Sequence, residues 1–311
     1  MVRKIKTYEN FNISKNHENS IMLVGNFDGL HLGHQKLFKM AKLFKKKYKL
    51  KIGVLTFEPM PKMFFKKQKN DFRIASLKQK NSLLSKQGVD FIINKKFDLK
   101  FSKTNAHNFI RNVLSKKLKI SFLFVSNNFR FGNKRKGNVK LLKNNQKNFN
   151  YKVIEPKPLK IKKRIISSSL IRNLLRQGKI TLANKYLSRE WQIVSVVKKG
   201  RQIGKKMGFP TCNMNIEPYV IAKPGVYAVK IKRLNSNKTL RGIANLGIRP
   251  TFNQKKILLE VHIFNFSGNL YNKELIIDFV YFIRKEKKFK SINQLKKQIS
   301  SDLKTAKNKL N

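Results

Sequence analysis

The stretch "IMLVGNFDGLHLGHQKLFKMAKLF", Ile21–Phe44, joins an apolar run to an amphipathic run through a glycine-rich loop. Residues 21–24 are short, apolar and partly β-branched, as in a buried parallel strand, and the run stops at Gly25. From Leu32 onward the apolar residues have the spacing of an amphipathic helix: Leu37, Phe38, Met40, Ala41 and Phe44. The pattern predicts a buried strand, a tight loop and the N-terminus of a helix.

This helix start is a predicted phosphate site. Its free backbone N–H groups and the positive end of the helix dipole favour an anion. His31 and His34 are three residues apart and share one face of the first turn, and Gly33 between them lets a ligand approach the backbone. A metal site is an alternative, but the Glu of a His-Glu-x-x-His motif is missing and the only cysteine, Cys212, is far away in sequence. Ordinary surface histidines are the other alternative.

The rest of the first half alternates between strand-like and helix-like segments. Apolar runs at residues 50–61, 89–97 and 120–126 are separated by amphipathic segments at residues 74–88 and 106–118. Gly88 suits a helix C-cap. The alternation predicts an α/β domain with a doubly wound parallel sheet, whose ligands bind beyond the carboxyl ends of the strands.

Two further segments of this half carry polar side chains suited to ligands. Residues 127–142, "NNFRFGNKRKGNVKLL", place Arg130, Lys134 and Arg135 among aromatics, which fits either phosphate and ring binding or a solvated turn. Residues 166–180, "ISSSLIRNLLRQGKI", place three serines before a helix that is predicted to end near Gly178. One serine would suffice as a cap, so the three serines with Arg172 favour a second phosphate site.

The pattern changes near Leu187. Residues 191–216 contain β-branched runs and three glycines without a long helical period, and strand-length runs follow at residues 225–234, 241–252, 257–266 and 275–284, with turn signals between them. Together they predict a small antiparallel barrel or sandwich, and residues 291–310 form a last helix-like segment. We therefore expect an α/β domain followed by a β domain with a C-terminal helix.

Length and composition bound the class of protein. The 311 residues are 41% hydrophobic, which is enough for two domains with cores of their own. A single cysteine excludes a disulfide framework and fits a reducing compartment. The N-terminus has no apolar signal segment, and the chain has no apolar run of membrane-spanning length. We expect a soluble, cytoplasmic protein with no membrane partner.

The formal net charge of +56 is the most conspicuous compositional feature. Lysine and arginine that face phosphates favour nucleic-acid binding, so a basic nucleic-acid-binding protein is one functional alternative. The lysines, however, are scattered along the chain rather than gathered in one stripe, and they accompany abundant Asn, Ile and Phe, whose codons are AT-rich. We therefore expect no specific nucleic-acid partner.

Eight stretches in this order resemble the bifunctional prokaryotic riboflavin kinase / FMN adenylyltransferase (FAD synthetase) family: "GNFDGLHLGH", "TFEPMP", "NFRFGNKRKG", "SSSLIR", "GFPTCN", "GVYAV", "ANLGIRPTF" and "LEVHIFNFSGNLY". The resemblance runs from about Ile21 to about Leu303. It implies a nucleotidylyl-transferase domain over residues 1–187 that makes FAD and pyrophosphate from FMN and ATP. It also implies a riboflavin kinase barrel over residues 188–311 that makes FMN from riboflavin and ATP.

For the first domain, the resemblance implies that His31, His34 and Arg172 are catalytic residues around the ATP phosphates. It implies further ATP contacts by Gly25, Phe27, Asp28, Gly33, Ser167 and Ser168. It places four residues toward the flavin nucleotide: Phe57, Pro59, Asn128 and Arg130. Where this chain has Asn128 the family usually has Asp, so one negative charge is missing near the flavin site; Ser169 replaces a usual Thr and keeps the hydroxyl.

For the second domain, the resemblance implies that Glu260 is the general base for the ribityl hydroxyl. It implies ATP binding by Gly204, Gly208, Thr211 and Asn213, with Mg²⁺ held by Thr211 and Asn213. From the residues alone, Glu260 is better interpreted as an ordinary outward carboxylate of a strand whose other face carries Leu259 and Val261. Cys212 replaces a usual Ala and is expected to pack.

The expected small-molecule partners are riboflavin, FMN, FAD and ATP, with Mg²⁺ as cofactor and a monomer or weak homo-oligomer as the assembly. One other enzymatic alternative is a monofunctional adenylyltransferase for another phosphorylated small molecule. That alternative leaves "GFPTCN" and "LEVHIFNF" without a purpose, as the nucleic-acid alternative does.

Overall fold

The computed structural model describes residues 5–65, 72–200, 204, 207–233, 238–251 and 254–311, with only the backbone described for the strand residues among 248–256. The chain divides into two compact units. The first unit comprises Met1–Lys69 and Leu77–Ser167, and the second comprises Asn70–Ser76 and Ser168–Asn311. Among the helices of the described ranges, none is both long and apolar enough to cross a bilayer.

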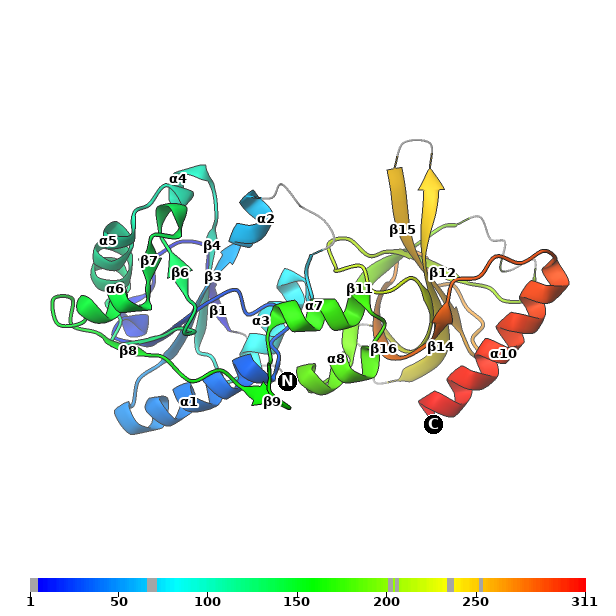
Figure 1. Cartoon of the computed structure of the whole chain (residues 1–311), viewed down its shortest axis with the longest axis horizontal. Coiled ribbons are helices and arrows are strands. Elements are labelled where there is room, and N and C mark those ends of the chain that lie inside the picture. Colours follow the sequence, from blue (N-terminus) through cyan, green and yellow to red (C-terminus); the bar gives the residue numbers. More distant parts are fainter. Residues whose placement is uncertain (1–4, 66–71, 201–203, 205–206, 234–237, 252–253) are drawn as a thin grey trace. The chain divides into compact units, whose positions relative to one another are not determined.

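A six-stranded parallel sheet forms the centre of the first unit (Figure 1). Its strand order is β1-β4-β3-β2-β5-β8, and every neighbouring pair is parallel. The strands are β1 (Lys6–Tyr8), β2 (Ile21–Val24), β3 (Ile52–Glu58), β4 (Phe91–Lys96), β5 (Phe122–Phe124) and β8 (Lys152–Ile154). The predicted doubly wound α/β sheet is confirmed, and the direction of winding reverses between β2 and β5.

Helices cover both faces of this sheet because successive side chains of a strand point to opposite faces. Ile21 and Leu23 of β2 pack in a core cluster with Phe38 of α1 and Leu84 of α3. Met22 and Val24 pack in a separate cluster on the other face. The helices are α1 (Leu32–Tyr48), α2 (Pro61–Phe65), α3 (Leu77–Ser85), α4 (Leu99–Ser102), α5 (Ala106–Asn108) continuing into the π-helix η2 (Phe109–Lys117), and α6 (Val139–Asn144).

The polar segment after β5 contains a two-stranded antiparallel ribbon of β6 (Arg130–Phe131) and β7 (Gly137–Asn138). The 3-10 turn η3 (Asn133–Arg135) connects the two strands. The first unit ends with a second short ribbon, β9 (Lys160–Ile161) and β10 (Arg164–Ile165), and also contains the 3-10 turn η1 (Lys15–His17) near its start.

The second unit is built on a closed antiparallel barrel with strand order β11-β12-β15-β14-β13-β16 (Figure 1). Pairing of β16 with β11 closes it. The strands are β11 (Trp191–Lys198), β12 (Cys212–Asn215), β13 (Gly225–Arg233), β14 (Thr239–Thr251), β15 (Gln254–Ile263) and β16 (Glu274–Lys285). Helix α10 (Ile292–Leu310) packs on the outer face against β13, β14 and β16. The predicted barrel and C-terminal helix are confirmed.

Two helices that precede residue 188 pack with the barrel: α7 (Ser168–Arg176) and α8 (Ile180–Leu187). The Asn184 amide of α8 donates to the Phe279 carbonyl at 2.8 Å, and its oxygen accepts from the Trp191 backbone N–H at 2.8 Å. The Trp191 indole donates to the Ile74 carbonyl at 3.0 Å, so segment 70–76 also joins this unit. The predicted functional boundary at Leu187 follows the sequence motifs and stays a prediction.

Candidate active sites

The predicted residues of the first site follow the carboxyl ends of three neighbouring strands. The loop Gly25–His31 follows β2, Phe57 and Pro59 lie at the end of β3, and Asn128 follows β5. Because β3, β2 and β5 are adjacent and parallel, these ends meet at one edge of the sheet. The winding reverses between β2 and β5, and in open α/β sheets such a reversal opens a crevice for ligands.

The loop after β2 has an uncommon backbone. Phe27 and Leu30 have φ values of 47° and 40°, and Gly29 between them has φ 77°. Bulky residues rarely adopt the left-handed region, and such residues concentrate at functional sites. Both side chains are buried in the core, at 3% and 1% exposure, so packing holds the loop in this conformation. The loop delivers His31 to the N-cap position of α1.

The two histidines of the site stack on each other. The ring centroids of His31 and His34 are 3.7 Å apart with an interplanar angle of 21°, and the Phe27 ring meets His34 edge-on at 5.2 Å. A Cβ on Gly33 would lie 2.9 Å from the Ile166 carbonyl oxygen and 3.1 Å from the His31 ring. Glycine therefore lets the chain just before Ser167 pack against the start of α1.

The residues expected to bind flavin are partly aromatic and partly exposed. Phe57 is half-buried and stacks on Phe101 with centroids 5.6 Å apart. Pro59 is half-buried, whereas Asn128 and Arg130 are exposed. The Asn128 side-chain oxygen accepts from the Ser126 hydroxyl at 2.9 Å. Asp28, in the loop after β2, is buried.

The serine and arginine residues of "SSSLIR" lie where the two units meet in sequence. Ser167 ends the first unit, and α7 begins at Ser168 in the second unit. Arg172 is buried, its Nε donates to the Phe72 carbonyl at 2.8 Å, and its guanidinium lies 3.8 Å from the centre of the Phe72 ring. Since Arg172 and the two histidines belong to different units, its role toward the same phosphates stays a prediction.

The second site is a cavity of ≈ 380 Å³ on the outside of the barrel. Strand pairing places five of its lining residues in one row across five neighbouring strands: Asn213, Glu260, Asn245, Val226 and Arg284. The alternate residues of β15, such as Leu259 and Val261, are fully buried in the barrel. Helix α10 provides the opposite wall of the cavity with Leu295, Ile299 and Asp302.

Glu260 therefore lines a cavity rather than an open surface. Its carboxylate belongs to the row between the amides of Asn213 and Asn245, and Thr211 and Phe209 line the same cavity. Its half-buried position gives a base limited contact with water while leaving it accessible to a substrate. Its role as base stays a prediction.

Glycines bring the backbone close to the polar end of this cavity. A Cβ on Gly200 would clash with the Asn213 amide, and a Cβ on Gly204 would clash with the Phe209 carbonyl and lie 3.4 Å from the Thr211 hydroxyl. The backbone N–H of Phe209 donates to the Gly204 carbonyl at 2.8 Å, and Gly208 has φ 88°. Residues 201–203 and 205–206 of this glycine-rich segment lie outside the described ranges.

Sequence reasoning missed several lining residues, namely Asn245, His262, Arg284, Phe289 and Asp302. His262 had a usable signal, because the period of two along β15 puts it on the same face as Glu260. Its Nδ1 lies 2.8 Å from the Pro210 carbonyl oxygen, so Nδ1 carries the proton and donates. The others come from separate strands and from α10, and only strand register and helix packing bring them to Glu260.

Cys212, the first residue of β12, lies between Thr211 and Asn213 in sequence but is not among the residues that line the cavity. It is half-buried, and burial raises the pKa of its thiol. A neutral thiol behaves as a small apolar side chain.

Comparison with known proteins places the chain in one family. The family model for FAD synthetase matches residues 13–170, and the model for riboflavin kinase matches residues 187–310. The chain is 41% identical to the bifunctional riboflavin kinase/FMN adenylyltransferase of Buchnera aphidicola subsp. Schizaphis graminum, covering 96% of this chain and 97% of that protein. The namesake from Haemophilus influenzae is 38% identical with 92% of each chain covered, and that of Escherichia coli K12 is 34% identical with 93% and 92% covered.

A solved structure described as a macrolide-efflux protein from Streptococcus pneumoniae has a TM-score of 0.85 to this chain at 26% identity, covering 97% of this chain and 98% of its own. The two family models match consecutive parts of the chain, and the relatives match it over nearly their whole length. The FMN adenylyltransferase domain is N-terminal and the riboflavin kinase domain is C-terminal. The chain belongs to the bifunctional riboflavin kinase/FMN adenylyltransferase family and is a bifunctional FAD synthetase.

Proposed function

We propose that the two reactions are carried out by the two sites described above, with the functional boundary at residue 187. FMN adenylylation is assigned to residues 1–187 and riboflavin phosphorylation to residues 188–311. The observation that carries the first assignment is the His31–His34 stack beside the sheet reversal. The observation that carries the second is the row of Asn213, Glu260 and Asn245 along one cavity.

In the first reaction, the FMN phosphate attacks the α-phosphate of ATP and pyrophosphate leaves. The attacking phosphate is already ionised at neutral pH, so this site has to bring anions together and offset the charge that develops on the α-phosphate. His31 and His34 at the N-terminus of α1 can donate to these oxygens, together with backbone N–H groups of the first turn. Further ATP contacts are proposed for Gly25, Phe27, Asp28, Gly33, Ser167, Ser168 and Arg172.

The flavin of FMN is proposed to lie toward Phe57, Pro59, Asn128 and Arg130. Phe57 already stacks on an aromatic neighbour, and a flat conjugated ring suits such a face. Arg130 is exposed and can pair with a phosphate. Asn128 presents an amide in place of the carboxylate usual in the family, so this site lacks one negative charge for positioning flavin or Mg²⁺.

In the second reaction, the ribityl hydroxyl of riboflavin attacks the γ-phosphate of ATP and ADP leaves. A hydroxyl, unlike a phosphate, needs a base to take its proton as the new P–O bond forms. Glu260 is the carboxylate in the lining row, and we assign it this role. Gly204, Gly208, Thr211 and Asn213 are proposed to face ATP, because the close approach of Gly204 to the Thr211 hydroxyl leaves backbone N–H groups near the polar end.

Mg²⁺ fits the polar end of the cavity as a partner of ATP. The Thr211 hydroxyl and the Asn213 amide oxygen are hard oxygen ligands of the kind that Mg²⁺ prefers. The described residues include no group of three or more His, Cys, Asp or Glu side chains that could hold a metal, so two protein ligands with phosphate oxygens and water suit this site. When bound, Mg²⁺ neutralises charge on the ATP phosphates.

We further propose that the enzyme acts in the cytoplasm as a monomer or weak homo-oligomer. The single cysteine fits a reducing compartment. Sedimentation of the purified chain over a range of concentrations tests the assembly.

The two assignments are tested by feeding each substrate separately. Purified protein is incubated with ATP and Mg²⁺ and with either riboflavin or FMN, and the flavins are separated by chromatography. FMN followed by FAD is expected from riboflavin, and FAD alone from FMN. A folded protein that produces neither flavin would contradict the proposal, and FAD formation without riboflavin phosphorylation would favour the monofunctional alternative.

A further inference from the structure

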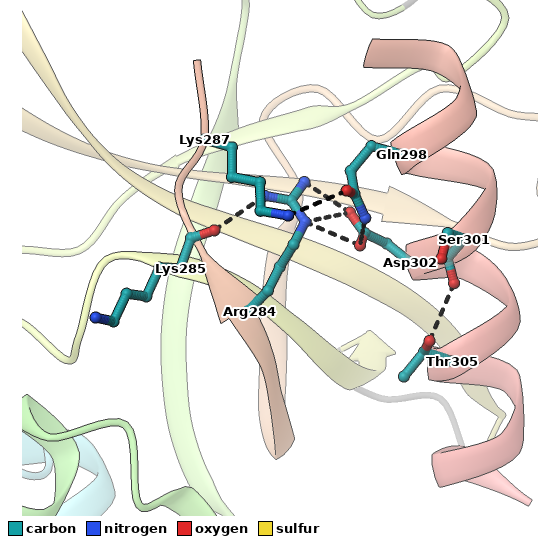
Figure 2. Close-up of polar contacts among 7 residues, drawn as sticks. All are labelled: Arg284, Lys285, Lys287, Gln298, Ser301, Asp302 and Thr305. Atoms are coloured by element: carbon teal, nitrogen blue, oxygen red, sulfur yellow. Dashed lines mark hydrogen bonds and ion pairs between the residues drawn. The ribbon is translucent and has the colours of Figure 1, made fainter. Parts of the chain in front are cut away.

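An ion pair joins β16 to α10 at the edge of the kinase cavity. The Nε atom of Arg284 lies 2.9 Å from Oδ1 of Asp302, and Nη2 lies 2.7 Å from Oδ2 (Figure 2). Both side chains are largely removed from water, with 15% of Arg284 and 3% of Asp302 exposed. Two parallel N–H···O bonds between a planar guanidinium and a carboxylate fix orientation as well as distance.

Further contacts tie this pair to its surroundings. The Gln298 amide donates to Oδ1 of Asp302 at 3.0 Å, one turn earlier on α10 (Figure 2). Nη1 of Arg284 donates to the Lys285 carbonyl at 3.0 Å, and the guanidinium lies 5.8 Å from the centre of the Phe289 ring. Arg284 therefore connects the end of β16, the segment that leads to α10, and α10 itself.

The cavity has two chemically different ends. Thr211 and Asn213 make one end polar, and the proposed function assigns that end to ATP. Elsewhere the lining carries five apolar side chains, Val226, Ile243, Phe289, Leu295 and Ile299, which we call the apolar end; the charged residues Arg284, Glu286, Lys287 and Asp302 also line the cavity. A flat conjugated ring suits this apolar end, with the attached ribityl chain leading toward Glu260.

Asp302 lies on the same face of α10 as two residues of the apolar end. Leu295, Ile299 and Asp302 are spaced by four and three residues, which is one stripe of a helix, and all three line the cavity. Fixing Asp302 thus fixes the distance from Leu295 and Ile299 to the barrel row that contains Glu260.

We infer that Arg284 and Asp302 are positioning residues for riboflavin, holding α10 so that its apolar stripe sets the ring where the ribityl hydroxyl reaches Glu260. The inference rests on the cavity being the kinase site. Removing one partner leaves the other charge buried and unpaired, which loosens α10 against β16. A displacement of about 1 Å in a reacting group can cost about a hundredfold in rate. The residues proposed to contact ATP, Gly204, Gly208, Thr211 and Asn213, lie outside α10.

Asp302→Asn in the full-length chain is the main test, because it keeps the shape and removes the charge. We expect the KM for riboflavin to rise about tenfold or more and kcat to fall, following the cost of misplacement. The KM for ATP and the rate of FAD formation from supplied FMN should stay within about twofold of the values for the unmodified chain. Effects of this size are usual for substitutions that lie away from a site. Arg284→Lys keeps the charge without the planar fork of the guanidinium. Its KM for riboflavin should lie between those of the unmodified chain and the Asp302→Asn chain.

Glu190→Gln is the matched control, because it breaks the 2.7 Å Lys230–Glu190 ion pair of the same unit, which is not part of the cavity lining. It should leave the KM for riboflavin and the KM for ATP unchanged.

A folded Asp302→Asn chain would overturn the inference if its KM for riboflavin were unchanged, or if its KM values for riboflavin and ATP rose equally. If that chain does not fold by circular dichroism, Gln298→Ala decides, because it removes one hydrogen bond to Asp302 and should raise only the riboflavin KM; an unchanged KM would again overturn it. An unmodified chain that makes no FMN would contradict the kinase assignment instead.

Discussion

The imidazole of His31 lies face to face with that of His34, with 3.7 Å between the ring centroids, at the first turn of α1. His31 is buried, and the Phe27 ring packs edge-on against the ring of His34. The two rings therefore hold each other in orientation, so loss of either ring disturbs both.

His34→Ala should reduce FAD formation from FMN by about a hundredfold to a thousandfold, the range found when one preorganised charge-stabilising donor is lost. FMN formation from riboflavin should be unaffected, because the cavity that we assign to phosphorylation is lined by residues of other strands. The measurement is the initial rate of each half-reaction. His107→Ala is the control, since His107 is an exposed histidine of the same unit. Equal loss of both activities would point to misfolding.

Gly33→Ala tests the close approach at the helix start. The new methyl group would lie 2.9 Å from the Ile166 carbonyl oxygen, so either α1 or the chain before Ser167 has to move. Overpacking of this kind costs about 1–3 kcal/mol. We expect a lower melting temperature and a larger loss of FAD formation than of FMN formation. An unchanged melting temperature together with normal FAD synthesis would show that the contact is not tight in solution.

Glu260→Gln separates a general base from an ordinary strand carboxylate. Glutamine keeps size and hydrogen bonding but cannot take the proton, so riboflavin phosphorylation should fall by about a hundredfold to ten-thousandfold. The same chain given FMN should still make FAD. Glu217→Gln, at an exposed glutamate of the same unit, is the control. Phosphorylation within a few-fold of the unmodified chain would remove Glu260 from the mechanism.

A comparison of two fragments tests where the kinase unit begins. A fragment of residues 188–311 carries all the kinase motifs and is predicted to make FMN and no FAD. A fragment of residues 168–311 adds α7 and α8, including the two hydrogen bonds of Asn184, each with a net stabilisation of about 1 kcal/mol. The longer fragment should therefore melt at a higher temperature in calorimetry. Equal melting temperatures would show that α8 contributes nothing to barrel stability.

The buried ring of His17 should make the stability of the first unit depend on pH. Burial, with the nearby Lys51 charge as a smaller cause, lowers the pKa of His17 below 6.5. Its ring stacks on Phe91 at 4.2 Å and is hydrogen-bonded to the Tyr8 hydroxyl at 2.8 Å. Below pH 6.5 His17 takes up a proton more readily in the unfolded chain than in the folded chain. The free energy of unfolding should therefore decrease as the pH drops.

Urea unfolding of the chain at pH 7.5 and 5.5 measures this effect. His17→Gln should show a smaller loss between the two pH values than the unmodified chain, whereas His107→Gln, at an exposed position, should show the same loss. Parallel behaviour of all three chains would mean that His17 has no part in the pH dependence.

The sequence was sufficient to predict the strands and helices whose hydrophobic pattern is local. The apolar run before Gly25, the period of α1 and the alternating runs after Leu187 predicted the parallel sheet and the barrel, because burial of one face or both imposes these patterns. Helix α8 was not predicted, since its eight residues are short for a periodic signal. The segment Phe109–Lys117 has helical periodicity but adopts a π-helix.

The long-range part of the sites could not be predicted in this way. Strand register pairs Glu260 with Asn245 and puts Arg284 three strands further along the same row, and this register is fixed by pairing between segments that are distant in sequence. The contact of Arg172 with Phe72 spans 100 residues. A family resemblance predicted Glu260 as the base, whereas the positions of Arg284 and Asp302 required the folded barrel and its helix.

The alternation along β15 separates two kinds of mutational sensitivity at the scale of a single residue. Leu259 and Val261 fill the inside of the barrel, whereas Glu260 and His262 line the cavity on its outside. In a saturation scan, apolar replacements at Leu259 and Val261 would be selected for protein abundance, and replacements at Glu260 and His262 for flavin output. An enzyme engineer could therefore vary substrate preference at His262 and heat tolerance at the adjacent Val261, with little conflict between the two searches.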